Sequence, residues 1–303
     1  MFDLISIGTI SVDFFFKGES LTFKDGRFQL ALGGKYSVPY FHHGVGGGGV
    51  NVAVGLERHG LEAAVIGKIG QNEFKQMILN TLERESVYHR YCTIEDDYYN
   101  VSSILLHEDG ERTVLHHQTP HVHSFETEAE LKPLQNATAV YIGNIADHRL
   151  HTREKIIFHL RRHKIPIIMN FGAQECALPK HHLIDFVRMI DVLIVNGHEF
   201  AQMVKAPYGD IDFSESVVQH YIPQLSHRLI VVTEGAAGSY AYLQDLVFHQ
   251  PIVKPHRIID TTGAGDGYTA GFIAKYLQTH NIRDAMHTGA TYAARIIAKI
   301  GAN

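Results

Sequence analysis

The chain has 303 residues, of which 45% are hydrophobic and 19% charged, a composition typical of a folded protein with a sizeable core. The net charge of −5 and the lack of any basic run argue against nucleic acid or an anionic membrane surface as a partner. No apolar run approaches the roughly 20 residues of a membrane span. Because Asp3 interrupts the first apolar segment and Cys92 and Cys176 lie far apart, we expect a reduced, cytoplasmic chain without a signal peptide.

In the first half of the chain, short apolar runs bounded by glycine or polar residues predict strands. These runs are residues 2–8, 63–67, 101–106 and 112–116. The last two alternate around the turn at 108–110, which is typical of a hairpin. Residues 14–43 are strand-like pieces split by glycines and Pro39, and we expect an edge hairpin there. Helical spacing predicts helices from Gly46 to the stop at Gly60 and over residues 72–85.

In the second half, strand and helix patterns alternate. Strands are predicted at 139–142, 165–170, 192–196 and 229–233, a hairpin at 240–248, and helices at 152–163, 265–278 and 283–300. Alternating units of this kind imply a mainly parallel sheet covered by helices on both faces. We therefore expect one α/β domain over residues 1–303, a three-layer α/β/α sandwich. Its small β-sheet lid would come from insertions at about 11–45 and 98–119.

A glycine-rich turn opens the helix predicted from residue 265. Ile258 and Ile259 precede it in a short extended run, and Thr262, Gly263, Ala264 and Gly265 follow at the mouth of the helix. The first amides of a helix have no intrahelical partner, and the positive end of the helix dipole lies behind them. The turn therefore predicts an anion-binding site, which the two glycines allow the anion to approach closely.

A carboxylate, Asp266, lies one residue beyond this turn. It would repel a bound phosphate unless a hydroxyl group lay between the two. An alcohol fits that gap, because Asp266 can accept its proton while the amides hold the charge of the phosphoryl group. The alternative is that Asp266 is only a favourable charge in the first turn of a helix.

A second glycine run, residues 44–49, satisfies the GxGxxG spacing of a dinucleotide site. It follows the predicted edge hairpin instead of the first strand, and no Lys-Ser/Thr pair follows it as in a P-loop, so both readings are weak. The 22 histidines include several adjacent pairs, but none has a metal-ligand spacing. We expect them in solvated loops and strands.

These stretches together resemble the motifs of the ribokinase-like (PfkB-type) carbohydrate kinases, in the family's order and over nearly the whole chain. The resemblance implies that Asp266 is the catalytic base and that Gly263, Ala264 and Gly265 form the anion hole. It also implies that Gly46, Gly47 and Asn51, which match a sugar-binding GGxGxN motif, bind the substrate with Asp13. Without the resemblance, Asn51 is a packed residue of a tight helix start and Asp13 a turn residue.

The same resemblance implies an ATP site on the second half of the chain. Asn196 and Glu199 match an NxxE element that orders Mg²⁺ through water, and Thr233, Gly235 and Gly238 match a turn beside the nucleotide. Without the family, a helix cap with a first-turn glutamate and a plain glycine turn explain these residues. Small residues at 289–294, Ala290 among them, would leave room for adenine. Asp260 and Thr262 match a K⁺ site, although the chain stops soon after the segment that completes it in relatives.

One departure concerns substrate choice. The family's D-x-N-x-R segment keeps only Asn170 here, so an anionic sugar would need a cation from elsewhere, for instance Lys35 or Arg112. We therefore expect an ATP-dependent kinase of a small sugar. The alternatives are a nucleoside kinase, with an aromatic clamp from Phe14, Phe16 or Phe41, and a catalytically silent sugar or nucleotide sensor. Exposed lid edges would allow a homodimer.

Overall fold

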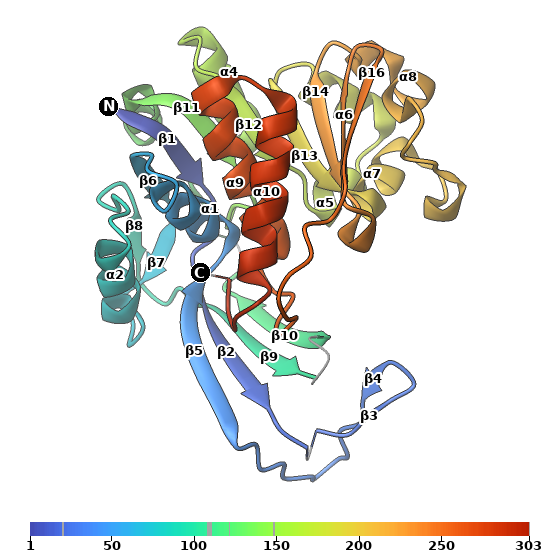
Figure 1. Ribbon diagram of the computed structural model, residues 1–303. Coiled ribbons are helices and arrows are strands. Elements are labelled where there is room, and N and C mark those ends of the chain that lie inside the picture. The colour runs from blue at the N-terminus through green and yellow to red at the C-terminus, as the bar shows by residue number, and fades with distance from the viewer. Residues whose placement is uncertain (20, 108–110, 121, 148, 303) are drawn as a thin grey trace.

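An eight-stranded sheet forms the centre of the molecule in this computed structural model, which describes residues 1–302 except 20, 108–110, 121 and 148 (Figure 1). The strand order is β16-β15-β14-β13-β12-β11-β1-β6. Six strands of this sheet pair in parallel, namely β1, β6, β11, β12, β13 and β14. The hairpin of β15 and β16 adds two antiparallel strands at one edge. Their bounds are β1 Phe2–Ile7, β6 Ala63–Ile66, β11 Ala137–Ile142, β12 Ile167–Asn170, β13 Val192–Asn196, β14 Leu229–Thr233, β15 Ser239–Leu243 and β16 Leu246–Gln250. The predicted mainly parallel sheet is confirmed.

Helices cover both faces of this sheet, as the alternation of β1 shows. Leu4 packs into a core with α1, α9 and α10, whereas Ile5 packs into the opposite core with α4, α6 and α7. Strands buried on both faces read as continuous apolar runs, which is why the sequence predicts them. The helices are α1 Gly48–Glu57, α2 Lys75–Arg84, α3 Glu128–Leu131, α4 Leu150–Arg162, α5 Ala173–Cys176, α6 Lys180–Val187, α7 Gly197–Val204, α8 Val217–Tyr221, α9 Ala264–Thr279 and α10 Ile282–Ile296.

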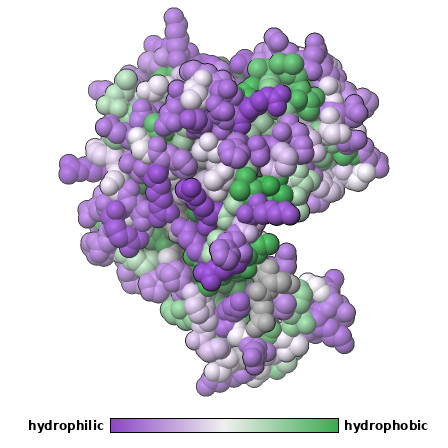
Figure 2. Space-filling view, viewed as in Figure 1, coloured by the Kyte–Doolittle hydropathy of each residue, from purple (hydrophilic) through white to green (hydrophobic). Residues whose placement is uncertain are grey.

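A second sheet of four strands projects from one end of the body and forms the lid (Figure 1). Its order is β10 (Arg112–Gln118), β9 (Asn100–Leu106), β2 (Ser11–Lys17) and β5 (Tyr40–Gly46). β9 and β10 form the predicted hairpin, whose turn at 108–110 lies outside the described residues. β2 pairs antiparallel with β5 and parallel with β9, so the two insertions make one sheet. Figure 2 shows a hollow between this lid and the body.

Some short elements differ from expectation. Residues 258 and 259 are not in a strand, and the amide of Ile259 instead donates to the carbonyl of Ile297 at 2.9 Å. Four short strands form two small sheets that the sequence does not single out, because two or three residues are too few for a periodic signal. They are β3 Phe23–Lys24 with β4 Arg27–Phe28, and β7 Lys68–Gly70 with β8 Thr93–Glu95.

Neither cysteine takes part in a disulfide. Across the described part of the chain, the helices are too short or too polar to cross a membrane.

Helices α1 and α9 lie side by side with the same chain direction, and this packing aligns their N-termini. Asn51 of α1 contacts Asp266 of α9, and one turn further along both helices Gly55 faces Ala270. A Cβ at Gly55 would lie 2.4 Å from the Cβ of Ala270, so glycine is needed for the helices to approach this closely. The packing therefore brings two chemically important helix starts to one place.

Candidate active site

A cavity of about 610 Å³ lies between the inner face of the lid and the ends of α1 and α9. From the body it is lined by Gly47, Asn51, Thr262, Gly263 and Asp266. From the lid it is lined by residues of three strands, among them Asp13, Ser102, Arg112, Val114, His116 and Gln118. The four residues of β10 alternate along the strand, because every second side chain of a strand lies on the same face. The cavity thus brings together substrate-side residues that the sequence predicts from segments about 250 residues apart.

Asp266 lies in the first turn of α9, directly after the anion-binding turn. Its Oδ2 accepts a hydrogen bond from Nδ2 of Asn51 at 2.7 Å. Burial raises the pKa of Asp266 above the usual aspartate range, and the charge of Asp13 adds to this, although the hydrogen bond from Asn51 opposes it. A carboxylate with a raised pKa is a stronger proton acceptor, which suits a general base.

The turn before α9 has the backbone form that an anion hole requires. Gly263 caps the helix with φ of 76°, and a Cβ there would lie 2.2 Å from the Cβ of Ala302. Of the following amides, that of Ala264 donates to the carbonyl oxygen of Thr261 at 3.4 Å, whereas those of Gly265 and Asp266 belong to the first helical turn, where helix geometry supplies no carbonyl partner. Around Gly265 an added Cβ would meet no atom within 4 Å, so space remains beside these amides.

Asp260 fixes this turn from behind. It is fully buried. Its Oδ1 accepts a hydrogen bond from the amide of Thr262 at 2.8 Å, and its Oδ2 accepts one from the amide of Gly301 at 3.0 Å. The hydroxyl oxygen of Thr262 is buried and has no hydrogen-bond partner. The turn therefore contains an oxygen that is available to a ligand.

At the other end of the cavity, Asp13 of β2 is held by two hydroxyl groups. Ser11 Oγ donates to its Oδ1 at 3.1 Å, and Ser102 also contacts it. Burial raises the pKa of Asp13, while the two serines and His116 lower it. Ser102 Oγ lies 3.2 Å from Nδ1 of His116, so the side chains of Asp13, Ser102 and His116 form a chain across three lid strands.

The glycines before α1 allow this close packing around Asp13. A Cβ at Gly46 would lie 2.1 Å from Oδ2 of Asp13. Gly47, which has φ of 93°, would place a Cβ 2.4 Å from the carbonyl oxygen of Thr9. Only glycine fits both positions. Gly47 lines the cavity, whereas Gly46 is buried against Asp13 and does not line it.

The predicted nucleotide-side residues lie at the carboxyl ends of β13 and β14, outside this cavity. Asn196 and Glu199 form a reciprocal capping box at the start of α7, with bonds of 2.8 and 2.9 Å. Burial raises the pKa of Glu199. The capping box is the alternative role that the sequence allows for Asn196 and Glu199, and it uses Oε2 of Glu199 as a hydrogen-bond acceptor.

The turn after β14 has the expected glycine geometry. It runs through a short 3₁₀ helix, Gly235–Ala237, with Thr233 before it and Gly238 after it. Gly235 and Gly238 have φ of 49° and 94°. Ala290 lies in α10 beside Gly289, whose missing side chain lets α10 pack against the backbone of Tyr268 in α9.

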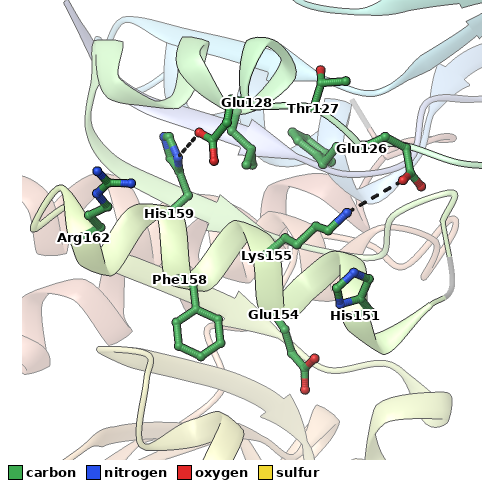
Figure 3. Close-up of a pocket in the computed structure, with 11 residues that line it drawn as sticks. Glu126, Thr127, Glu128, His151, Glu154, Lys155, Phe158, His159 and Arg162 are labelled. Carbon is green, nitrogen blue, oxygen red and sulfur yellow. Dashed lines mark ion pairs between the residues drawn. The ribbon is translucent and has the colours of Figure 1, made fainter.

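A second cavity, of about 390 Å³, lies between the α3 segment and α4 (Figure 3). Its polar side chains contact one another: His159 lies 3.6 Å from Glu128, and Lys155 lies 3.7 Å from Glu126. None of the predicted site residues lines it. The larger cavity under the lid is therefore the candidate active site.

Comparison with known families matches residues 1–303 to the pfkB family carbohydrate kinases. The chain belongs to this family. It is accordingly an enzyme, an ATP-binding sugar kinase with the ribokinase-like fold.

Individual relatives differ in the acceptor that their names give. The chain is 26% identical over 253 residues to probable fructokinase-6 of Arabidopsis thaliana, covering 78% of this chain and 63% of that protein. It is 24% identical over 313 residues to a nucleoside kinase of Methanocaldococcus jannaschii, covering 97% and 90% of the two chains. Its fold resembles Arabidopsis thaliana ribokinase complexed with ribose and ATP, with a TM-score of 0.79, 19% identity and coverage of 99% and 94%.

Two sequence-based expectations about this kinase's site do not match the cavity. Asn170, at the end of β12, does not line it. The aromatic clamp is also absent from its lining: Phe14, Phe16 and Phe41 pack on one another on the other side of the lid, where Phe14 also meets Phe74. Strand alternation explains this, because Asp13 points into the cavity and Phe14 therefore points away.

The structure adds lining residues that sequence reasoning did not predict. Ser102, His116 and Gln118 come from the lid, and Asn144 follows β11. Asn144 could have been found as the polar residue after a parallel strand, where ligands bind in open α/β sheets. The lid residues carry no comparable signal in the sequence. The alternation of side chains along a strand shows that the two faces of the lid sheet differ, but not which face meets the cavity.

Proposed function

We propose that this kinase transfers the γ-phosphoryl group of ATP to a hydroxyl group of a small sugar, with residues 1–303 acting as one catalytic domain. The observation that carries the proposal is the position of Asp266, a half-buried carboxylate in the first turn of α9 that shares a cavity with Gly263 and Asn51. An alcohol between Asp266 and the first amides of α9 would be activated on one side and face the phosphoryl group on the other.

The residues of this chain divide the work between two ends of the cavity. Asp266 takes the hydroxyl proton, and the amides of Gly263, Ala264 and Gly265 stabilise the charge on the phosphoryl group. Asp13 and the backbone of Gly47 bind the remaining hydroxyls, Gly46 makes room for the carboxylate of Asp13, and the Asn51 amide orients Asp266. Asn170 lies outside the cavity, so we assign it no contact with the sugar.

Two metal sites fit the available oxygens. The Oε1 atom of Glu199 is not part of the capping box, so this half-buried carboxylate can hold Mg²⁺ through water, where the ion would neutralise nucleotide phosphates. The unpartnered hydroxyl of Thr262, beside the carboxylate of Asp260, fits a monovalent cation such as K⁺. Asn196, Thr233, Gly235, Gly238 and Ala290 would border the nucleotide.

A sugar is favoured over a nucleoside as the acceptor because of what lines the cavity. The lid contributes Arg112, Val114 and His116 there, whereas Phe14, Phe16 and Phe41 pack on one another on the opposite face of the lid. A planar base therefore lacks the phenylalanine clamp that a nucleoside kinase would use. The related names point to fructose and ribose as the first sugars to test.

The test is ADP release from the wild-type protein with ATP, Mg²⁺ and a panel containing fructose, ribose, other small sugars, adenosine and inosine. We expect turnover with at least one sugar and slow ATP hydrolysis without it, because the closed lid excludes water. Turnover with nucleosides alone would select the nucleoside kinase. Binding without turnover across the panel would identify the silent sensor.

The outer face of the lid supports a homodimer. Phe41 and Leu115 are 53% and 60% exposed on it, and pairing two lids would bury this apolar surface. Sedimentation of the wild type against Phe41→Asp tests this, because the charge should yield monomers if the lids pair. An unchanged sedimentation coefficient would exclude this interface.

A further inference from the structure

A third cavity, of about 240 Å³, lies at the carboxyl ends of β1 and β6. We call it the edge cavity, because β6 is an edge strand of the main sheet. Open α/β sheets bind ligands at the carboxyl ends of their strands. Its polar and small lining residues include Gly8, Lys68, Arg90, Thr93, Ser124 and Ala146.

Two basic side chains line the edge cavity. Lys68 of β7 is 8% exposed, and its Nζ donates to Oε2 of Glu95 at 2.5 Å. Glu95 does not line the cavity, and an ammonium group has two further donors. Arg90 is exposed and has no hydrogen-bond or ion-pair partner among the described residues. The acid in the lining is Glu130, whose Oε2 already accepts bonds from Thr127. The lining therefore has an excess of positive charge, in a chain whose net charge is −5.

The rest of the lining combines hydroxyl groups with apolar surface. Thr93 and Ser124 supply the hydroxyl groups. The apolar surface comes from Ile7, Ile66, Phe125, Pro133 and Ile145. A few placed polar groups in an apolar lining are typical of small-molecule sites, which usually measure about 300–1,000 Å³ for drug-sized ligands. An occupant of this smaller cavity must be a small anion with a short apolar body.

The edge cavity and the active-site cavity share two segments of the chain. Gly8 lines the edge cavity, and Thr9 lines the active-site cavity. After β11, Ala146 lines the edge cavity, and Asn144 lines the active-site cavity. Gln118, the last residue of lid strand β10, donates from Nε2 to the carbonyl oxygen of Ala146 at 3.1 Å. The lid is thus bonded to a segment that also lines the edge cavity.

We propose that the edge cavity binds a small organic oxyanion, a phosphate ester or a carboxylate, and that its occupancy favours sugar binding. The guanidinium group of Arg90 contacts two oxygens of the anion, and the ammonium group of Lys68 contacts a third. An anion in this place holds Ala146, whose carbonyl receives the bond from Gln118. Occupancy therefore favours the closed lid and lowers the sugar KM.

Calorimetry of the wild type tests binding with glycerol 3-phosphate, succinate and phosphoenolpyruvate, which carry a phosphate, carboxylates or both. Glycerol is the uncharged control. Saturating ADP and Mg²⁺ keep the phosphate positions of the active site occupied during the titrations. We expect at least one of the anions to bind at one site per chain, and glycerol not to bind.

The decisive variant is Arg90→Met, because Arg90 is exposed and its loss leaves no buried partner, whereas Lys68→Met would leave Glu95 unpaired. Arg90→Met should weaken anion binding about tenfold or more, as for lost hydrogen bonds to a charged group. Arg84→Met is the matched control, since Arg84 is 71% exposed and lies outside the lining. It should bind the anion as the wild type does.

Steady-state kinetics with the best sugar measures the link to the lid. The anion that binds should lower the sugar KM about fivefold or more in the wild type. Arg90→Met should lose this effect and keep the KM that the wild type has without the anion. Gln118→Leu should still bind the anion but show no fall in KM on adding it.

Two results would overturn the proposal. If none of the three anions bound, or if Arg90→Met bound them normally, the edge cavity would not be their site. Binding with an unchanged or raised sugar KM would overturn the link to the lid. Failure of the wild type to turn over any acceptor would count against the proposed function alone, because calorimetry decides the edge cavity without turnover.

Discussion

Replacing Asp266 by asparagine changes one atom and removes one charge. The side-chain oxygen of asparagine can still accept the hydrogen bond that Nδ2 of Asn51 donates to Asp266 at 2.7 Å. Asn51, α1 and α9 should therefore keep their positions. What disappears is the ability to accept a proton, so the substitution isolates general-base catalysis from the architecture around it.

The two readings of Asp266 predict losses of different size and kind. As a base it should contribute about 10²–10⁴-fold to kcat, or about 2.7–5.4 kcal/mol of barrier at about 1.36 kcal/mol per tenfold change. As a charge at a helix start it would contribute about 0.3–1 kcal/mol of stability and nothing to kcat. Asp284 provides the control, because it occupies the same third position of α10 and does not line the cavity.

The free energy of unfolding gives an independent check, because the direction of the pKa shift of Asp266 fixes the sign of its contribution to stability. Burial raises the folded-state pKa of Asp266, so ionisation of this group favours the unfolded chain, and its stabilising contribution is lost as the pH rises through that pKa. At pH 7 Asp266→Asn should thus be at least as stable as the wild type in urea unfolding.

The assay is single-turnover phosphorylation of the sugar, with calorimetry to show that ATP and sugar still bind. We expect Asp266→Asn to bind both and to react at least 100-fold more slowly, while Asp284→Asn reacts normally. Near-normal turnover by Asp266→Asn would refute the assignment of the base. A large loss of stability in this variant would show that its inactivity has a structural origin.

Further predictions concern the neighbouring residues. Asp13→Asn should raise the sugar KM more than it lowers kcat. In the wild type the sugar KM should rise as the pH falls through the raised pKa of Asp13, because protonation removes a hydrogen-bond acceptor. Profiles of KM against pH for the two proteins test this. Gly55→Ala should cost about 1–3 kcal/mol in urea unfolding, because its Cβ would meet that of Ala270 at 2.4 Å, whereas Gly209→Ala, with no atom within 4 Å, should be neutral. Glu199→Gln should raise the Mg²⁺ concentration needed for half-maximal rate, and an unchanged requirement would remove Glu199 from the metal site.

The parallel sheet and the start of α9 follow from local sequence. β11 to β14 are buried on both faces, which leaves apolar runs that can be read directly, and glycine before a periodic apolar stretch marks a helix start. Asp266 and Gly263 are close neighbours in the sequence, so their geometry is fixed by one turn of helix. That part of the site is local, and the sequence predicts it.

The lid's contribution is not local. Whether Arg112 meets Thr261 depends on the pairing of β2 with β9 and on the position of the whole lid, neither of which a residue pattern encodes. The aromatic clamp of the nucleoside kinase alternative could not be judged from the sequence for a related reason: the sequence shows that Phe14 and Phe16 share a face, but not which face meets the cavity. Asn170 was placed by resemblance, and the described cavity leaves it out.

The environments of Asp13 and Asp266 also argue for their separate roles. Burial raises the pKa of both carboxyl groups. The charge of Asp260 raises the pKa of Asp13 further, and the charge of Asp13 raises that of Asp266. Asp13 receives two serine hydroxyls and faces His116, which favour its ionised form, whereas Asp266 receives one amide hydrogen from Asn51. A carboxylate held ionised by several donors suits binding, and one with fewer donors keeps an oxygen for a proton. The fall of kcat at low pH should therefore report protonation of Asp266. If this fall were lost in Asp13→Asn instead, Asp13 would be the base and Asp266 the binding residue.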